Sequence, residues 1–335
     1  MARVVWTDFS SVKVEGAAEL IKHGANSEID LPDRRSGIAE FVRRASTEIT
    51  THDEHVVPDL GRSLPQGTTV YIAHTPKASL NDVMRVSQRV QSVGLRASPH
   101  IVARRIPDES ALRAALRDLR RVGIEQVLLI AGDREAPVGP YQDALAVIDS
   151  DVLADAGIRN VAVAGHPEGI KGVEPGRLWE ALRRKQEFGS RSGISVHIAT
   201  QFGFDPQGIC AWVRSLGLHG ITLPVHVGVA GPTSLGKLMR FAVACGVGAS
   251  LRMAKKDIKA VTRVASAAMT PEEMIPALLQ CQAECGHSQI VQPHFFSFGG
   301  ALQTASWICA VGAGDFRIAP DEKIEVHRST DTQHW

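Results

Sequence analysis

The chain has 335 residues, of which 44% are hydrophobic and 22% are charged, a composition typical of globular proteins with a large core. Its 37 lysines and arginines balance 36 aspartates and glutamates, which argues against a broad electrostatic surface for nucleic acid or anionic lipid. The aromatic share of 5% is low for stacking single-stranded bases. No apolar run approaches the roughly 18–20 residues of a membrane helix, and the first residues lack a secretory signal pattern. We therefore expect a cytoplasmic protein with no nucleic-acid or membrane partner.

Short β-rich runs alternate with amphipathic helical stretches along most of the chain. This alternation is typical of a parallel sheet whose strands are connected by helices. We expect eight strands, at Asn26–Leu31, Thr68–Ala73, Ala97–Val102, Gln126–Ile130, Asn160–Ala164, Ser195–Thr200, Leu223–Gly228 and Gln289–Phe296.

Several of the intervening helices have recognisable first residues. Ser79 is placed as an N-cap, Asp108 precedes a run with leucines at helical spacing, and Thr270 precedes Pro271 and two glutamates. Glycines 94, 123, 157 and 286 come shortly before strands, where a helix end favours a left-handed residue.

Eight strands and about as many helices favour an α/β fold, a single (β/α)8 TIM barrel with extra helices and short terminal appendages. An open doubly wound sheet stays an alternative, because alternation does not report closure. We expect the barrel at residues 26–312, an N-terminal extension at 1–25 and a C-terminal tail at 313–335. The stretch 251–269 reads as an extra basic helix.

The five cysteines include no CxxC pair. Cys281 and Cys285 are four residues apart in an expected helix, a spacing that could present two thiols on one face. With no other ligand nearby in the sequence, we interpret the cysteines as buried thiols of a reducing compartment rather than as a metal site.

Reacting groups of a (β/α)8 barrel lie at the carboxyl ends of its strands, so polar residues there are the candidates. Each candidate also has a purely structural interpretation. Glu28 could be a surface carboxylate, Asp133 could cap a helix, and His166 could be a loop histidine without a role. Gln201 is more informative, since a buried amide must find partners and can also read the edge of a heterocycle. No GxGxxG, GxxxxGK[ST], HExxH or GxSxG motif occurs, so generic nucleotide, zinc and hydrolase motifs give no support.

Taken together, these segments resemble the methylenetetrahydrofolate reductase family, over roughly residues 26 to 310. Glu28-Ile-Asp-Leu-Pro32 looks like the family's Glu-Phe-Phe-Pro-Pro, and Ser98-Pro-His100 looks like its Ala-Pro-His. Further segments follow in the same order: Gly132-Asp133 with Tyr141, His166-Pro167-Glu168, Arg184-Lys185 and Ile198-Ala-Thr-Gln201-Phe-Gly-Phe-Asp205.

The resemblance implies a reductase that converts 5,10-methylenetetrahydrofolate to 5-methyltetrahydrofolate, with NADH or NADPH as hydride donor and FAD as cofactor. Glu28 would be the general acid that opens the folate ring, and Asp133 would stabilise the cationic intermediate. Substrate contacts would come from Gln201, Lys237 and Phe241. Cofactor contacts would come from His100, Gly132, Asp133, Tyr141, His166, Arg184 and Lys185.

The chain also departs from the family pattern. Ala131, Leu178 and Ala181 stand where the family has polar flavin contacts, a threonine expected near Ala73 is missing, Lys237 replaces a glutamine, and Gly299-Gly300 replaces Asn-Arg. These changes leave three alternatives open: a flavin-independent reductase, a methyltransferase-like folate barrel, and a non-catalytic folate-binding relative. A homo-oligomer also stays open.

Overall fold

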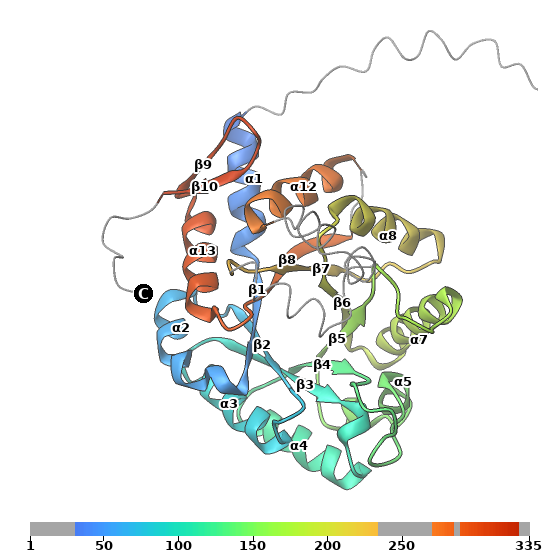
Figure 1. Cartoon of the computed structure of the whole chain (residues 1–335). Coiled ribbons are helices and arrows are strands. Elements are labelled where there is room, and N and C mark those ends of the chain that lie inside the picture. Colours follow the sequence, from blue (N-terminus) through green and yellow to red (C-terminus); the bar gives the residue numbers. More distant parts are fainter. Residues whose placement is uncertain (1–30, 234–269, 285–288, 328–335) are drawn as a thin grey trace, which may run out of the picture.

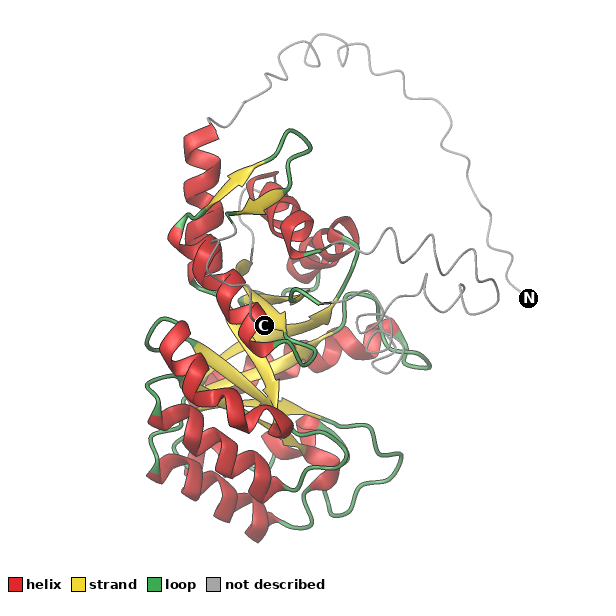
Figure 2. Ribbon diagram, turned by 60° about the vertical axis from the view of Figure 1, so that its left-hand side comes forward, coloured by secondary structure: helices red, strands yellow, loops and turns green. Residues whose placement is uncertain are grey.

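A computed structural model describes residues 31–233, 270–284 and 289–327 of the chain. Within these residues, eight parallel strands pair in sequence order and the eighth pairs with the first, so the sheet is a closed barrel. Helices surround the strands on the outside (Figures 1 and 2). Closure confirms the expected (β/α)8 barrel and excludes the open doubly wound sheet.

The barrel strands are β1 (Ser46–Thr50), β2 (Thr69–Ala73), β3 (Arg96–Val102), β4 (Gln126–Ile130), β5 (Asn160–Gly165), β6 (Ser195–Phe202), β7 (Val225–Ala230) and β8 (Ile290–Phe296). The main helices are α1 (Leu31–Arg43), α2 (Val57–Ser63), α3 (Leu80–Ser92), α4 (Glu109–Arg121), α7 (Pro175–Ser192), α8 (Pro206–Leu218), α12 (Pro271–Glu284) and α13 (Ala301–Ala313). Shorter elements are η2 (Thr51–Val56), η3 (Ala103–Arg105), α5 (Ala144–Ile148), α6 (Val152–Asp155), and the hairpin strands β9 (Phe316–Ile318) and β10 (Ile324–Val326).

Seven of the eight strand predictions are confirmed to within a few residues, but the first is wrong. Leu31 begins helix α1, residues 26–30 lie outside the described part of the chain, and β1, between β8 and β2, is Ser46–Thr50. The Ser-Thr-Glu-Ile-Thr segment has a single aliphatic residue, Ile49, so its apolar signal is weak. Its polar side chains are tolerated because several of them have polar partners inside the barrel.

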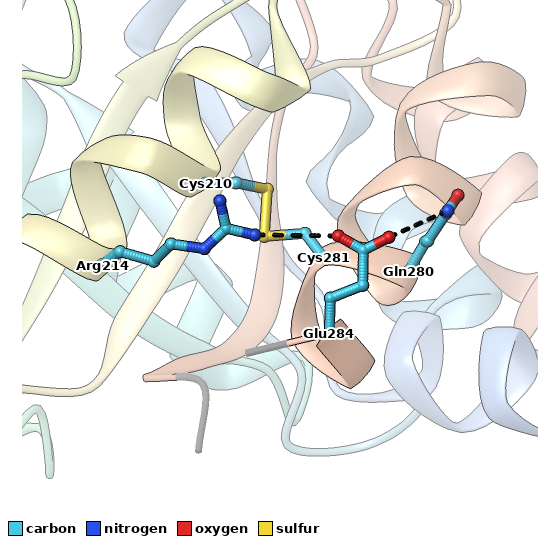
Figure 3. The surroundings of a disulfide bond; sticks show 5 residues. All are labelled: Cys210, Arg214, Gln280, Cys281 and Glu284. Carbon is cyan, nitrogen blue, oxygen red and sulfur yellow. Dashed lines mark hydrogen bonds and ion pairs between the residues drawn. A yellow bond between two sulfur atoms is a disulfide. The ribbon is translucent and has the colours of Figure 1, made fainter. Parts of the chain in front are cut away.

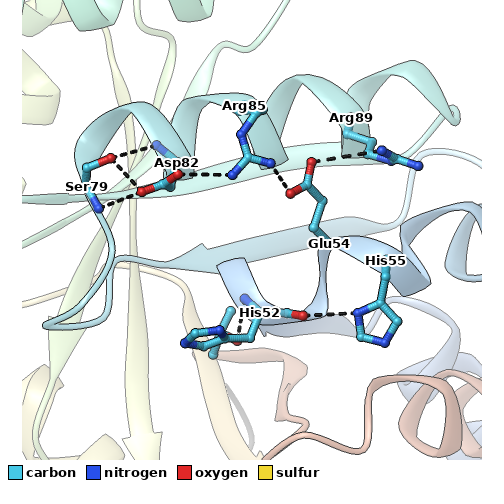
Figure 4. Close-up of polar contacts among 8 residues, drawn as sticks. His52, Glu54, His55, Ser79, Asp82, Arg85 and Arg89 are labelled. Atoms are coloured by element: carbon cyan, nitrogen blue, oxygen red, sulfur yellow. Dashed lines mark hydrogen bonds and ion pairs between the residues drawn. The ribbon is translucent and has the colours of Figure 1, made fainter.

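Helices α3 and α4 begin at the N-cap residues that the sequence predicts. Ser79 accepts a hydrogen bond from the Asp82 amide, and the Asp82 carboxylate accepts one from the Ser79 amide, which completes a capping box for α3. Asp108 caps α4 in a similar way. Figure 4 shows how the same region ties η2 to α3, since Glu54 forms ion pairs with Arg85 and with a second arginine of the helix.

Two apolar layers lie on opposite sides of the strands. In β4, Val127 and Leu129 face the surrounding helices and belong to the main core. Leu128, between them, faces inward and packs with Tyr71 and two small residues, Ala162 and Ala199, in a separate interior cluster. Because the two alanine side chains are short, the remaining volume of the barrel interior is available to polar side chains.

Cys210 on α8 and Cys281 on α12 form a disulfide bond (Figure 3), so the interpretation of these cysteines as buried thiols is wrong for this pair. Cysteines 71 residues apart cannot be paired from sequence, because the fold alone brings the two helices together. Cys309 is the free thiol of the described ranges, and Cys285 lies outside them. No helix in those ranges combines the length and apolarity needed to cross a membrane.

Candidate active site in the barrel

A carboxylate is held between two imidazoles inside the barrel. The Oε2 atom of Glu48 lies 3.2 Å from Nε2 of His100 and 3.7 Å from Nε2 of His294. Strand β2 separates β1 from β3, so the contact between Glu48 and His100 crosses the barrel interior. Each of the three residues lies two positions before the carboxyl end of its strand. They therefore form one layer just below the end at which barrel enzymes hold their substrates.

The charge state of Glu48 follows from this setting. Burial raises the pKa of its carboxyl, but the imidazoles of His100 and His294, both within 4 Å of the carboxylate, outweigh burial and lower the pKa from 4.5 to about 2. Glu48 is therefore an anion at neutral pH. Because the groups are coupled, a proton taken up here belongs to the carboxylate–imidazole pair rather than to one residue.

Further polar side chains continue the network toward the amino ends of the strands. The Tyr71 hydroxyl lies 2.9 Å from Nε2 of His197, and the His197 ring stacks on His226 with centroids 4.1 Å apart. Burial lowers the pKa of His197 to about 4 and that of His226 to about 2, so both rings are neutral at neutral pH. Burial and the Glu48 charge raise the pKa of Tyr71, which keeps its hydroxyl protonated. No sequence motif singles out Tyr71, His197 or His226, although their inward positions on expected strands could have indicated them.

Aromatic rings gather where β6 and β8 end. The ring centroid of Phe202 lies 4.8 Å from that of Phe298, 5.4 Å from that of Phe296 and 5.7 Å from that of Phe204. Phe298 has a φ of 48°, a left-handed conformation that is uncommon outside glycine and occurs often at functional sites. Gln201 is half-buried beside Phe202, at the second-last position of β6. The end of β6 therefore combines an amide with an apolar wall.

The loops after β2, β3 and β4 are joined by one guanidinium group. Arg105 donates to the carbonyl oxygens of His74 and Thr75 and forms an ion pair with Asp133 at 2.8 Å. The Arg105 hydrogen bond lowers the pKa of Asp133. The Thr75 hydroxyl oxygen and Nδ1 of His74 are buried without a hydrogen-bond partner in the described part of the chain.

A pocket of about 440 Å³ opens between the loop after β5 and helices α7 and α8. His166 and Leu178 line it, together with two stacked tryptophans, Trp179 and Trp212, whose ring centroids are 6.0 Å apart. Burial lowers the pKa of His166 to about 4, so its ring is neutral at neutral pH. The volume and the aromatic wall suit a planar organic group.

Lys185 projects from the buried face of α7 and interacts electrostatically with His166 and Asp143. Burial lowers the pKa of its ammonium group to about 8, and no hydrogen bond or ion pair to it is present among the described residues. A buried cation without a hydrogen-bonded counterion is suited to an anionic ligand.

The expected cofactor residues thus divide into two groups. His100, Gly132, Asp133, His166 and Lys185 lie inside the barrel, on its loops or at the pocket beside them. Tyr141 is instead buried in the main apolar core, and Arg184 is on the outer surface, paired with Asp149 at 2.6 Å. Gly132 has a φ of +96°, and a Cβ there would meet the Val102 side chain, so local packing already requires glycine. The buried Lys185 ammonium beside His166 suits an anionic group, and the pocket that His166 lines suits a planar one.

Three expected site residues cannot be placed: Glu28, Lys237 and Phe241 lie outside the described residues. The first-strand carboxylate that the structure does show is Glu48. Among the described residues, no group of three or more His, Cys, Asp or Glu side chains is arranged to hold a metal ion.

Fold and site together define a (β/α)8 barrel with an acid–base cluster under its carboxyl end. No family model matches the chain. It is similar to dihydropteroate synthase from Thermus thermophilus, with 12% identity, a TM-score of 0.42 and coverage of 79% of this chain and 92% of that one. It is also similar to a sialic acid aldolase of Ruminococcus gnavus, with 11% identity, a TM-score of 0.36 and coverage of 59% of this chain and 64% of that one. The match thus spans less than two thirds of the aldolase chain.

Proposed function

We propose that the chain is an oxidoreductase that reduces 5,10-methylenetetrahydrofolate to 5-methyltetrahydrofolate, or catalyses the reverse oxidation, with NADH or NADPH. The observation that carries the proposal is the contact of 3.2 Å between Glu48 and His100 just below the carboxyl end of the barrel. The ordered resemblance of the strand ends to methylenetetrahydrofolate reductases supports it. A folate and a nicotinamide nucleotide would be the partners, in the cytoplasm.

The reaction needs a proton on the bridging folate nitrogen and then stabilisation of a cationic iminium. We assign the acid–base role to Glu48 with His100, in the place for which the resemblance implies Glu28. The Glu48 carboxyl alone is a poor acid at neutral pH, because its pKa is about 2. The proton would therefore be delivered from the imidazole side of the pair, and the remaining carboxylate would stabilise the cation. General acid–base catalysis of this kind contributes about 10²–10⁴-fold.

Gln201 and the phenylalanines beside it would hold the pterin. A half-buried amide can pair with a heterocycle edge, and the Phe202 cluster offers an apolar face. Asp133 would add negative charge near the cationic intermediate, held in place by Arg105. Roles for Lys237 and Phe241 in substrate binding stay predictions.

FAD, when bound, would supply the hydride carrier. Gly132, His166 and Lys185 would hold it, and Thr75 offers one more hydroxyl. Tyr141 and Arg184 do not fit this role, because one is in the core and the other is paired on the outer surface. This loss of contacts favours, as a second candidate, a reductase that passes hydride from NAD(P)H to the folate without flavin.

The test uses the purified full chain. Flavin absorbance is measured first, and NADH or NADPH oxidation is then followed with 5,10-methylenetetrahydrofolate, with and without added FAD. We expect turnover that Glu48→Gln lowers by at least about 10²-fold. The control Glu54→Gln removes a carboxylate outside the barrel and leaves the rate near wild type.

Each alternative has its own outcome. Turnover unaffected by FAD supports the flavin-independent reductase. Folate binding without nicotinamide oxidation, with or without transfer of a methyl group, overturns the proposal in favour of a methyltransferase-like or non-catalytic barrel.

A further inference from the structure

A second buried contact lies beside the Glu48–His100 pair. Nδ1 of His294 is 2.9 Å from the hydroxyl oxygen of Ser46, and Nε2 of the same ring faces Glu48. Ser46 and His294 are register partners on the neighbouring strands β1 and β8. Neither residue is more than 1% exposed, so water does not compete for these contacts. His294 therefore links a hydroxyl on one side to the site carboxylate on the other.

The hydrogen atoms of this network can be assigned from its donors. The side-chain amide of Gln292 donates to the Ser46 oxygen at 3.4 Å. The hydroxyl still has its own hydrogen and a second lone pair, and donation of that hydrogen to Nδ1 of His294 is the arrangement that the tautomer experiment below tests. In that arrangement Nδ1 is an acceptor, so the ring proton resides on Nε2, on the side of the Glu48 carboxylate.

The orientation of the His294 ring is also fixed by packing. Tyr71 contacts it edge-on with centroids 4.5 Å apart, and Phe296 contacts it edge-on at 4.9 Å. The titratable and charged groups around the ring are Glu48, His100, Tyr71, His197 and His226. A ring flip would have to break both aromatic contacts and the Ser46 hydrogen bond. The Nε2 side of the ring thus stays toward Glu48, 3.7 Å from its Oε2 atom, which is an ion-pair distance and longer than a hydrogen bond.

We infer that Ser46 and His294 are positioning residues that keep the Glu48 carboxylate anionic and aimed at His100, and so set the pH range in which that pair exchanges a proton with the substrate. The inference rests on the proposed function for its kinetic part only. Hydrogen bonds that orient a reacting or ligating group typically change activity by about 10–100-fold when they are removed.

The structural part is tested by ¹⁵N NMR of the histidine rings in the full chain. A His294→Gln variant identifies the His294 signals by their loss. We expect the Nε2-protonated tautomer in the wild type and a mixture of tautomers in Ser46→Ala, because Nδ1 then loses its donor. Ser46→Thr keeps a hydroxyl and restores the wild-type pattern. If Ser46→Ala does not fold, Ser46→Cys substitutes a weak donor of similar size and partly shifts the tautomers.

The matched control is Thr47→Val on the same strand. The Thr47 hydroxyl is equally buried but donates to the carbonyl oxygen of Phe295 at 3.2 Å, so its loss leaves the His294 ring unchanged. An unchanged His294 tautomer in Ser46→Ala, or an equal change in Thr47→Val, overturns the positioning role. This readout needs no turnover and decides the inference even if the proposed reaction fails.

The kinetic part is tested with the pH profile of folate reduction. Ser46→Ala is expected to lower kcat about tenfold and to move the acidic limb of the profile, with KM for the folate unchanged. Ser46→Thr is expected to recover both values. A limb that stays in place while kcat falls would indicate a merely structural role and contradict the inference.

Discussion

The anionic state of Glu48 predicts a pH-dependent cost for the substitution Glu48→Gln. Glutamine keeps the shape of the protonated acid but cannot carry its charge. One pKa unit corresponds to about 1.4 kcal/mol, so lowering the pKa from 4.5 to about 2 corresponds to about 3 kcal/mol of native-state stability. This contribution is present above the unfolded pKa and is lost as the pH falls from 4.5 toward 2.

The expected result is a difference in unfolding free energy that shrinks in acid. At pH 7, Glu48→Gln is expected to unfold about 3 kcal/mol more easily than the wild type, and the difference should vanish near pH 2. Urea unfolding followed by circular dichroism at a series of pH values measures it.

Glu54→Gln is the control, since Glu54 pairs with Arg85 on the outside of α3 (Figure 4). Such surface pairs contribute about 0–1 kcal/mol. A pH-independent difference for Glu48→Gln, or a variant more stable than the wild type at pH 7, would refute the argument that the two imidazoles hold the carboxylate as an anion.

Three further predictions concern stability. Reduction of the Cys210–Cys281 disulfide, or Cys210→Ser, should destabilise the fold by about 4 kcal/mol, because the bridge spans 71 residues. Thermal scans with and without reductant measure this loss, and the control Cys309→Ser should leave the melting temperature unchanged. In the wild type, the His226 ring stays neutral in the fold and takes up a proton on unfolding below pH 6.5, which lowers the unfolding free energy as the pH falls. His226→Leu should reduce this slope by up to about 1.4 kcal/mol per pH unit in denaturant titrations, and an unchanged slope would contradict the prediction. Lys185→Met should raise the unfolding free energy at pH 7 by up to about 3 kcal/mol and should weaken FAD binding measured by fluorescence quenching. The gain in stability should disappear as the pH rises from about 8 to 10.5. A destabilised variant would contradict the assignment of Lys185 as a buried cation without a hydrogen-bonded counterion among the described residues.

Strand periodicity was informative wherever a strand is apolar. Segments such as Gln126–Ile130 and Asn160–Gly165 pack against helices on one face and against small or apolar side chains on the other. Their sequences are therefore nearly continuous apolar runs, which predict buried strands. The first strand could not be found in this way, because Ser46, Thr47 and Glu48 satisfy their polar groups by contacts with β8 and β3. The apolar spacing of Ile38, Phe41 and Val42 just before it is the signal that would have indicated a helix leading into a strand.

The position of a candidate residue could be predicted where it depends on the residue's own strand or loop, but not where it depends on closure of the barrel. His100 and Asp133 follow directly from their places at strand ends. The partnership of Glu48 with His294 joins the first strand to the last, a contact that exists only once the barrel closes. The outward direction of Arg184 could not be judged either, since one position along a helix separates the buried Lys185 from the exposed Arg184.

The hairpin of β9 and β10 has a consequence for how this chain can be rearranged. It lies beside α1, where Arg34 pairs with Glu322 and Arg35 donates to the carbonyl oxygen of Gly314, so the first described helix and the last described strands meet at one place on the barrel (Figure 1). In a chain shortened to its described residues, the ends that meet here could be joined by a short linker, and circular permutation is tolerated best where the joined ends are close. New termini could then be opened at a surface turn such as the one at Gly220, which has a φ of +70° and lies between α8 and β7. A permuted barrel would keep β1 paired with β8, and with it the contact between Ser46 and His294 beside Glu48.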